Sequence, residues 1–268
     1  MNCPLDKNTR FSVIGMGRSG VAAANFLNSA GFDVLISDGK EESCLEKSIS
    51  MLNAGISVVA GRNEVRRGDV AVISPGIPPH SQVFRYALQN ASELIGEIEL
   101  FYRFCPAPII AVTGTDGKST VTTLTGHILR NAGLKTHVGG NLGNPLTGML
   151  GGIMRDSVVV AEVSCFQLIT TRSFRPKIGV VTNIAEDHTD YHGSFENYVA
   201  AKKMTLRNMA EGDCFVKNID DAEISGWHAP AGVSTIEISS ERRLSEGVSR
   251  GGDDIVITRN GRMKKIIG

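Results

Sequence analysis

The sequence predicts an α/β protein of two successive domains, a Rossmann-like domain followed by a second α/β domain of the P-loop type. Short runs of β-branched residues alternate with helical stretches, and two of these runs are each followed by a glycine-rich turn. Strand–helix–strand units of this kind build parallel sheets. The composition agrees, because 41% hydrophobic and 21% charged residues are usual for a globular chain that buries a core.

The first domain is expected over residues 1–105. Its four predicted strands are continuous apolar runs, typical of strands buried on both faces; they cover residues 11–14, 33–37, 56–60 and 70–74. A helix is expected over residues 21–29, where apolar residues recur at helical spacing up to Gly31. We place the domain boundary at Pro106, after an apolar, helix-like stretch at 93–104.

The second domain is expected over residues 106–268. Its predicted elements are strands at 109–112, 158–163 and 178–184 and helices at 118–131 and 195–209. Near the end of the chain, Asn260-Gly261 separates two strand-like runs. This dipeptide is the strongest short signal for a β-hairpin.

Charge and cysteine content narrow the class of protein. The 28 Lys and Arg residues balance 28 Asp and Glu residues, so there is no electrostatic reason to expect nucleic acid or an anionic membrane as partner. The five cysteines are widely spaced without a C-x-x-C pair, as in reduced cytosolic proteins. No run reaches the ~18 apolar residues of a membrane span. We therefore expect a soluble cytoplasmic protein.

The first glycine-rich turn is Gly15–Gly20, G-M-G-R-S-G, with Asp38 at the end of the next predicted strand. Glycines between a strand and a helix let a phosphate approach the backbone, and a carboxylate after the second strand can meet a sugar hydroxyl. This turn alone suggests an NAD(P) dehydrogenase. A tight turn without a ligand is the simpler alternative, and the glycines do not say which nucleotide is bound.

The second glycine-rich turn, A-V-T-G-T-D-G-K-S-T at 111–120, is the stronger signal. Its backbone N–H groups can surround phosphate oxygens, Lys118 can reach the terminal phosphates, and Ser119 can offer its hydroxyl to Mg²⁺. The standard P-loop pattern requires glycine where this chain has Val112, so the loop is a shorter variant. A glycine turn without phosphate is the alternative.

Further motifs give these turns a family context. They are G-G-N-L-G at 139–143, A-E-V-S-C-F-Q-L at 161–168, N-I-A-E-D-H-T-D-Y-H at 183–192 and Y-V-A-A-K at 198–202. Together with the second turn they resemble the Mur ligase and folylpolyglutamate synthetase superfamily. Within it, their order and S-P-G-I-P-P at 74–79 are similar to the branch that adds D-glutamate to UDP-N-acetylmuramoyl-L-alanine. The resemblance implies ATP-dependent amide formation through an acyl phosphate, with ATP and two Mg²⁺ ions.

The resemblance also implies which residues serve the nucleotide and the metals. The ATP-binding set is Gly114, Thr115, Asp116, Gly117, Lys118, Ser119 and Thr120; the catalytic set is Lys118, Glu162, His188 and Lys202; the metal set is Ser119, Glu162, His188 and Lys202. Glu162 ends a strand beside the turn, as a magnesium carboxylate would, and Lys202 is expected to be carbamylated. Without the family, His188 reads as a loop residue and Lys202 as solvated surface. Gly193 argues against a helical zinc pair of His188 and His192.

The expected substrate-binding residues follow from the same resemblance. Gly15, Gly17, Arg18, Ser19, Asp38 and Gly76 are assigned to the uridine diphosphate, and Asn141, Ser164 and Gln167 to the muramoyl-alanine end. Two positions depart from the pattern, because Gly39 and Lys40 stand where other members carry a hydroxyl and an arginine.

The length bears on activity. The resembling ligases have three domains, whereas 268 residues suffice for two. We therefore expect a monomeric fragment that holds the UDP-sugar site and the phosphate half of the ATP site but lacks full turnover. Two alternatives from other classes are an NAD(P)-binding Rossmann dehydrogenase and a non-catalytic nucleotide-binding fragment.

Overall fold

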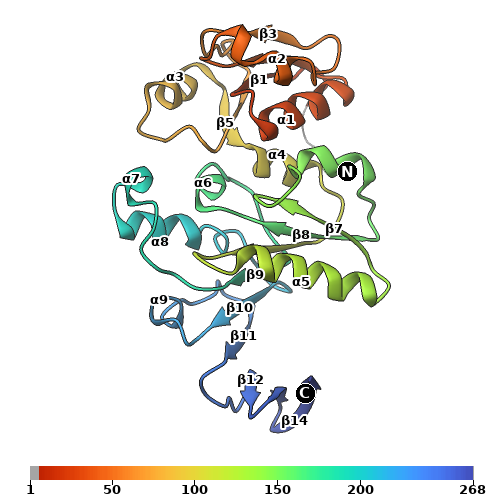
Figure 1. Ribbon diagram of the computed structural model, residues 1–268, viewed down its shortest axis with the longest axis vertical. Helices are drawn as coiled ribbons and strands as arrows, with labels where there is room; N and C mark the ends of the chain where they lie inside the picture. The colour runs from red at the N-terminus through yellow and green to blue at the C-terminus, as the bar shows by residue number, and fades with distance from the viewer. Residues whose placement is uncertain (1–5, 268) are drawn as a thin grey trace. The chain divides into compact units, whose positions relative to one another are not determined.

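The computed structural model describes residues 6–267 and confirms the predicted α/β class. The chain forms two compact units, and it passes between them more than once. The first unit contains the chain up to Ala107 together with His137–Ser157 and Ser164–Phe174, and the second contains Pro108–Thr136, Val158–Val163 and the chain from Arg175 onward. Figure 1 colours the chain from red at its N-terminus to blue at its C-terminus.

The strands of the first unit form a parallel sheet in the order β3-β2-β1-β4-β5. Their bounds are Arg10–Ile14 (β1), Asp33–Ser37 (β2), Ser57–Val59 (β3), Val70–Ile73 (β4) and Glu93–Gly96 (β5). The first four confirm the predicted strands within one or two residues. The fifth corrects the sequence analysis, since the stretch at 93–104 expected to be helical begins as a strand.

The first unit also contains helices. They are α1 (Arg18–Ser29), α2 (Glu46–Ile49), α3 (Gln82–Asn90), α4 (Glu97–Phe104) and α6 (Cys165–Leu168), with 3₁₀ turns η1 (Glu42–Cys44) and η2 (Thr147–Gly152). The buried face of α1 carries Val21, Ala24 and Leu27, as its apolar spacing predicts. The helix therefore begins earlier than predicted but presents the predicted face.

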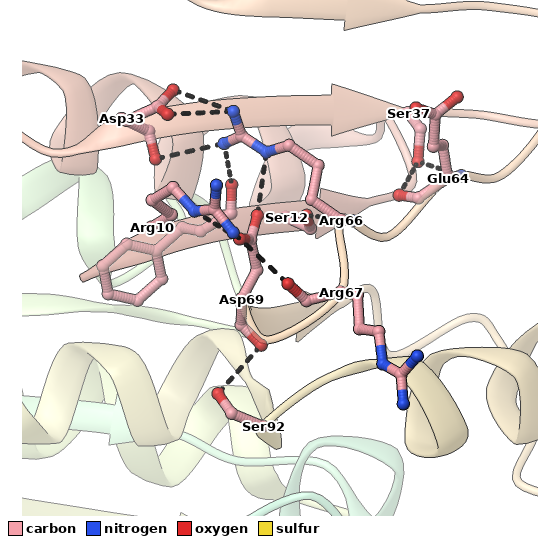
Figure 2. Close-up of polar contacts among 10 residues, drawn as sticks. Arg10, Ser12, Asp33, Ser37, Glu64, Arg66, Arg67, Asp69 and Ser92 are labelled. Atoms are coloured by element: carbon pink, nitrogen blue, oxygen red, sulfur yellow. Dashed lines mark hydrogen bonds and ion pairs between the residues drawn. The ribbon is translucent and has the colours of Figure 1, made fainter. Parts of the chain in front are cut away.

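The N-terminal edge of the first sheet is held by a buried carboxylate (Figure 2). Asp69 precedes β4 and accepts a hydrogen bond from Ser12 Oγ at 2.7 Å. Its carboxylate also pairs with Arg66 Nε at 2.9 Å and with Arg10 Nε at 3.0 Å. Arg66 continues to Asp33 at 2.9 Å, so the beginnings of β1, β2 and β4 are joined. The first glycine turn follows β1 at the opposite, C-terminal edge of this sheet.

The larger sheet has the order β14-β13-β12-β11-β10-β9-β6-β8-β7. Its strands are Ile109–Thr113 (β6), Lys135–Gly140 (β7), Ser157–Glu162 (β8), Ile178–Val181 (β9), Cys214–Asn218 (β10), Ser234–Ser239 (β11), Gly247–Gly251 (β12), Asp254–Arg259 (β13) and Arg262–Ile267 (β14). The predicted hairpin is confirmed, because β13 and β14 pair antiparallel. At its tip Asn260 and Gly261 both have positive φ, of 52° and 68°, as a two-residue hairpin turn requires.

Four helices belong to the second unit. They are α5 (Lys118–Asn131), α7 (Thr189–His192), α8 (Phe195–Lys203) and α9 (Ala222–Ser225). Helix α5 has the predicted bounds and follows β6 through the second glycine turn; Figure 1 draws it in yellow-green. Helix α8 was predicted to reach residue 209 but ends at Lys203, and a run of turns follows it. Among the helices of residues 6–267, none combines the length and apolar composition needed to cross a membrane.

Candidate functional site

The second glycine turn lies between β6 and α5 in the second unit. Gly114 has φ of 143°, and Gly117 has φ of 75° and is the N-cap of α5. Helix α5 begins directly at Lys118, so the first N–H groups of the helix have no intrahelical acceptor and carry the positive end of the helix dipole. This end of α5 is therefore suited to bind an anion.

Two lysines reach the carbonyl groups of this turn. Lys118 Nζ donates to the Thr115 carbonyl at 2.6 Å, and Lys202 Nζ donates to the Gly114 carbonyl at 2.6 Å. Lys202 is 2% exposed and its ammonium lies 4.6 Å from the centroid of the Tyr198 ring. Two cations thus stand beside consecutive peptide groups of the turn. Such a concentration of positive charge favours a ligand with several negative charges.

The structure separates Lys202 from its neighbour Lys203, which the sequence could not do. Lys203 is 48% exposed, and its ammonium lies 3.5 Å from Glu223 Oε1 and 5.0 Å from the Trp227 ring. Because α8 turns successive side chains to different faces, only Lys202 of this pair reaches the glycine turn. The alternative interpretation of Lys202 as solvated surface is therefore wrong, since its side chain is buried.

Ser119 and Glu162 are brought together at the start of α5. Glu162 is 2% exposed at the end of β8, where it is the register partner of Val112 in β6. Ser119 Oγ donates to Glu162 Oε2 at 2.7 Å. A hydroxyl beside a carboxylate is a set of hard oxygen donors, which fits Mg²⁺ with water completing its coordination. Both residues were predicted as metal ligands.

His188 stands in the acidic loop after β9 and is half exposed. Its Nε2 lies 3.3 Å from Asp187 Oδ2, and its ring centroid lies 6.4 Å from that of Tyr198. Burial lowers the pKa of the neighbouring His192, and the charges of His188 and Lys202 act in the same direction. No group of three or more His, Cys, Asp or Glu side chains within residues 6–267 is arranged to hold a metal. The aromatic ring of Tyr198 lies near both His188 and Lys202.

The first glycine turn is built around a carboxylate instead of cations. Asp38 Oδ2 accepts from the Met16 N–H at 2.7 Å, and Oδ1 accepts from the Lys40 N–H at 3.0 Å. Gly20 must be glycine, because a Cβ there would overlap the Gly15 carbonyl oxygen. Asp38 therefore stands next to the turn as predicted, but two of its hydrogen bonds fix the backbone.

Arg18 and the loop after β7 meet in the first unit. The Arg18 guanidinium donates to the Gly143 carbonyl at 3.1 Å, and the Gly140 N–H donates to the Asn144 carbonyl at 2.9 Å. A hollow of about 530 Å³ lies beside this contact. It is lined by Arg18, Val21, Asn25 and Phe26 of α1, by Met51, and by Asn144, Pro145 and Thr147. Ser19, Gly76 and Asn141 belong to the same unit, with Gly76 and Asn141 exposed.

A buried carboxylate anchors the segment that follows this loop. Glu97 is 3% exposed, and its Oε1 accepts from the Thr147 N–H at 2.7 Å and from the Thr147 hydroxyl at 2.8 Å. Burial raises the pKa of Glu97, while the hydrogen bonds from Thr147 and from the Leu146 backbone act against that increase. Glu97 was not singled out from the sequence, because a glutamate in a helix carries no signal of burial.

Ser164 and Gln167 are used to start a helix. The Ser164 hydroxyl accepts from the Gln167 N–H at 3.3 Å, and Gln167 Oε1 accepts from the Ser164 N–H at 3.0 Å. This reciprocal pair is a capping box at the N-terminus of α6. Both side chains are buried. Their predicted contact with substrate remains a prediction, and the structure adds a local role for each.

Comparison with known proteins matches the chain to two consecutive family domains. Residues 112–265 match the Mur ligase middle domain, and residues 9–96 match the MurD-like N-terminal domain of Mur ligases. The UDP-N-acetylmuramoylalanine--D-glutamate ligase of Pelotomaculum thermopropionicum is 41% identical over 257 residues, which are 93% of this chain and 56% of that protein. The ligase of the same name from Geobacter metallireducens is 40% identical over 94% of this chain and 57% of its own. The chain thus spans a little over half the length of these relatives.

Solved structures agree at the level of the fold. The UDP-N-acetylmuramate:L-alanyl-gamma-D-glutamyl-meso-diaminopimelate ligase from Neisseria meningitides has a TM-score of 0.58 at 17% identity and covers 96% of this chain and 86% of that one. A murein peptide ligase from Psychrobacter arcticus has a TM-score of 0.55 at 16% identity, with 97% of this chain and 61% of that one covered.

Proposed function

Because the chain belongs to the Mur ligase family, we propose that its two glycine turns bind two of the three substrates of an ATP-dependent amide ligation. The turn of the second unit binds the phosphates of ATP. The turn of the first unit binds the uridine diphosphate of UDP-N-acetylmuramoyl-L-alanine, to which D-glutamate is added. The observation that carries the proposal is the pair of lysines on the second turn, next to the Ser119–Glu162 pair.

The proposed reaction has two displacements. An oxygen of the alanine carboxylate bonds to the γ-phosphorus of ATP, and the bond from that phosphorus to the bridging oxygen breaks to release ADP. The amine nitrogen of D-glutamate then bonds to the acyl carbon, loses a proton, and phosphate leaves. Both steps gather negative charge, so fixed cations and helix dipoles supply the stabilisation. Lys118 and the N-terminus of α5 provide it for the phosphates.

One pair of residues suits a metal ion as it stands, and a second pair would suit one only after a covalent modification. Ser119 and Glu162 would hold Mg²⁺, which when bound neutralises phosphate charge. In its unmodified form Lys202 is a donor, bonded to Gly114, and does not suit a cation. Carbamylation of Lys202 would supply the anion that a second ion, shared with His188, requires.

The remaining parts of the proposal concern setting and competing functions. Small-molecule substrates fit the balanced charge, and a cytoplasmic location fits the widely spaced cysteines. A monomeric state is part of the same proposal. The dehydrogenase alternative explains only the first turn, since a dehydrogenase has no use for Lys118, Ser119 and Glu162 as a set. ADP release that depends on both D-glutamate and UDP-N-acetylmuramoyl-L-alanine would exclude a non-catalytic nucleotide-binding role.

Isothermal titration tests the proposal. The chain is titrated separately with Mg-ATP, UDP-N-acetylmuramoyl-L-alanine and NADH, and we expect binding of the first two only. Lys118→Ala should remove Mg-ATP binding and leave UDP-sugar affinity unchanged, because the two turns belong to different units. Lys203→Ala is the matched control, since it removes an exposed cation that lies on Glu223. NADH binding without UDP-sugar binding would exclude the proposal.

A further inference from the structure

The residues directly after β9 hold the phosphate turn by its backbone. Asn183 Oδ1 accepts from the Asp116 N–H at 2.8 Å, and Asn183 Nδ2 donates to the Asp116 carbonyl at 3.2 Å. One side-chain amide thus bonds both polar groups of a single residue, as a neighbouring strand would. The Asn183 carbonyl also accepts from the Thr115 N–H at 2.9 Å.

These bonds decide which N–H groups of the turn are available to a ligand. The N–H groups of Thr115 and Asp116 are both used by Asn183. Those of Lys118, Ser119 and Thr120 belong to the first turn of α5, where an α-helix offers no acceptor. The geometry therefore assigns phosphate contact to the helix start, and Thr115 and Asp116, which the sequence analysis included among the ATP-binding residues, to the support of the turn.

Thr182 strengthens the same support. Its hydroxyl donates to the Asp116 carbonyl at 2.7 Å, so this oxygen accepts from two side chains. The hydroxyl also packs against Gly114, where a Cβ would overlap it. The turn is consequently fixed at Gly114 and at Asp116 by consecutive residues of one segment.

The supporting segment is itself anchored on its far side. Asn218 Nδ2, at the end of β10, donates to the Thr182 carbonyl at 2.7 Å. The Ile184 N–H donates to Asp221 Oδ2 at 2.7 Å, and Asp221 Oδ1 accepts from Ile224 N–H to cap α9. Because both flanks of Asn183 are tied to other elements, its amide is held in the orientation that the Asp116 peptide needs.

We propose that Asn183 is a positioning residue for nucleotide binding: it touches no phosphate, and it orients the start of α5 by fixing the Asp116 peptide. This inference rests on the proposed binding of ATP phosphates at the turn. It predicts that removing the Asn183 side chain weakens binding of the phosphate groups whether or not a nucleoside is attached to them. Mg-ATP and magnesium tripolyphosphate, which lacks the nucleoside, should therefore lose affinity by the same factor.

Hydrogen exchange of the unmodified protein is the first test, because it needs no variant. We expect slow exchange of the Thr115 and Asp116 amides without nucleotide, and little change on adding Mg-ATP. The amides of residues 118–120 should gain protection with Mg-ATP. Fast exchange at 115 and 116 in the free protein, or strong protection there only with nucleotide, would overturn the inference.

Two substitutions provide the second test. Asn183→Ala should reduce the affinity for both phosphate ligands about 10- to 100-fold, the loss typical of residues that orient a binding site. Asn183→Asp keeps the acceptor for the Asp116 N–H but loses the donor to its carbonyl and adds a negative charge, so it should not restore affinity. Asn90→Ala, which removes an amide bonded to the Tyr86 carbonyl in the first unit, is the matched control and should leave both affinities unchanged.

The outcomes separate this inference from the proposed function. If the unmodified chain does not bind Mg-ATP, the proposed function fails. If it does and Asn183→Ala binds Mg-ATP equally well, only the inference fails. Urea denaturation of each Asn183 variant reports whether its second unit, which contains residue 183, is still folded; a loss of phosphate affinity counts for the inference only in a folded variant.

Discussion

The two glycine turns follow similar strand-to-helix paths but are surrounded by opposite charges. In the first unit a carboxylate, Asp38, bonds the turn through the Met16 N–H. In the second unit two ammonium groups, of Lys118 and Lys202, bond the turn through its carbonyls. Some N–H groups are already bonded in both turns, since the Met16 N–H donates to Asp38 and the Thr115 and Asp116 N–H groups donate to Asn183. The difference is that a carboxylate stands beside the first turn and ammonium groups stand beside the carbonyls of the second. Glycine spacing thus describes the backbone path of a turn, while side chains from distant segments determine which charges surround it.

The largest expected effect is that of Gly114→Ala in the second turn. The residue has φ of 143°, which L-residues rarely adopt, and a Cβ would overlap the Thr182 hydroxyl. We expect a loss of about 3 kcal/mol or more in unfolding free energy, together with loss of Mg-ATP binding. Urea denaturation and calorimetric titration measure the two effects.

Gly117→Ala is the control for that change. Its φ of 75° also disfavours alanine, but no atom lies within 4 Å of a Cβ there, so the cost should be only about 1 kcal/mol. Equal losses in unfolding free energy at Gly114 and Gly117 would mean that the positive φ alone, and not the contact with Thr182, accounts for the cost of alanine.

Gly20→Ala should be the next largest effect and should fall on the first turn. A Cβ at Gly20 would overlap the Gly15 carbonyl oxygen, which belongs to rigid backbone, so α1 would have to move away from β1. We expect a loss of about 2–3 kcal/mol and weaker UDP-sugar binding, with Mg-ATP affinity unchanged. Gly17→Ala meets no atom within 4 Å and should cost about 0.5 kcal/mol, the preference of an N-cap for glycine over alanine. A similar loss of Mg-ATP affinity would contradict the independence of the two turns.

Asp38→Asn tests the charge at the first turn with little change in shape. The variant loses the charge that strengthens the bond from the Met16 N–H, and we expect a loss of about 1–2 kcal/mol in stability together with weaker UDP-sugar binding. Chemical denaturation and titration with the UDP-sugar measure both. An unchanged affinity for the UDP-sugar would show that the carboxylate serves the fold alone.

The smallest effect is a pH dependence from Glu97, which holds the Leu146–Thr147 backbone in the first unit. Burial raises the pKa of Glu97 above its ordinary value of 4.5, so its contribution to stability is fully present below about pH 4.5 and is lost as pH rises through the raised pKa. Glu97→Gln does not titrate. Its melting temperature relative to the unmodified protein should therefore rise as the pH increases from about 4.5 through the raised pKa of Glu97.

Glu93→Gln is the opposite-sign control for that experiment. Hydrogen bonds from the Arg103 guanidinium lower the pKa of Glu93, so its stabilisation is present above about pH 4.5 and is lost at lower pH. Removing this charge should make the variant relatively less stable above about pH 4.5 than at lower pH, so this control is measured from below about pH 4.5 upward, and it should show no slope between about pH 5 and about pH 8. If the relative melting temperatures of both variants change with pH in the same direction, the raised pKa of Glu97 does not explain the pH dependence.

The sequence by itself determined the class of fold and the position of both turns. Continuous apolar runs such as 33–37 and the helical spacing in α1 are local signals, because a strand buried on both faces or a helix on a sheet must carry them. The stretch at 93–104 was wrongly predicted as helix throughout, because its apolar residues fit the start of a helix as well as a short strand. Only pairing with β4 makes Glu93–Gly96 a strand. Lys118 and Ser119 could be predicted because they are adjacent in sequence to the glycines that present them.

Only the tertiary structure decided what surrounds the turns. Lys202 reaches Gly114 across 88 residues of chain, and Asn183 reaches Asp116 across 67. Neither contact has a local signature, because a lysine on a helix and an asparagine after a strand are ordinary in any sequence. Parallel strands bring their C-terminal ends to one edge of the sheet, and it is this topology that turns distant polar residues into the neighbours of one backbone turn.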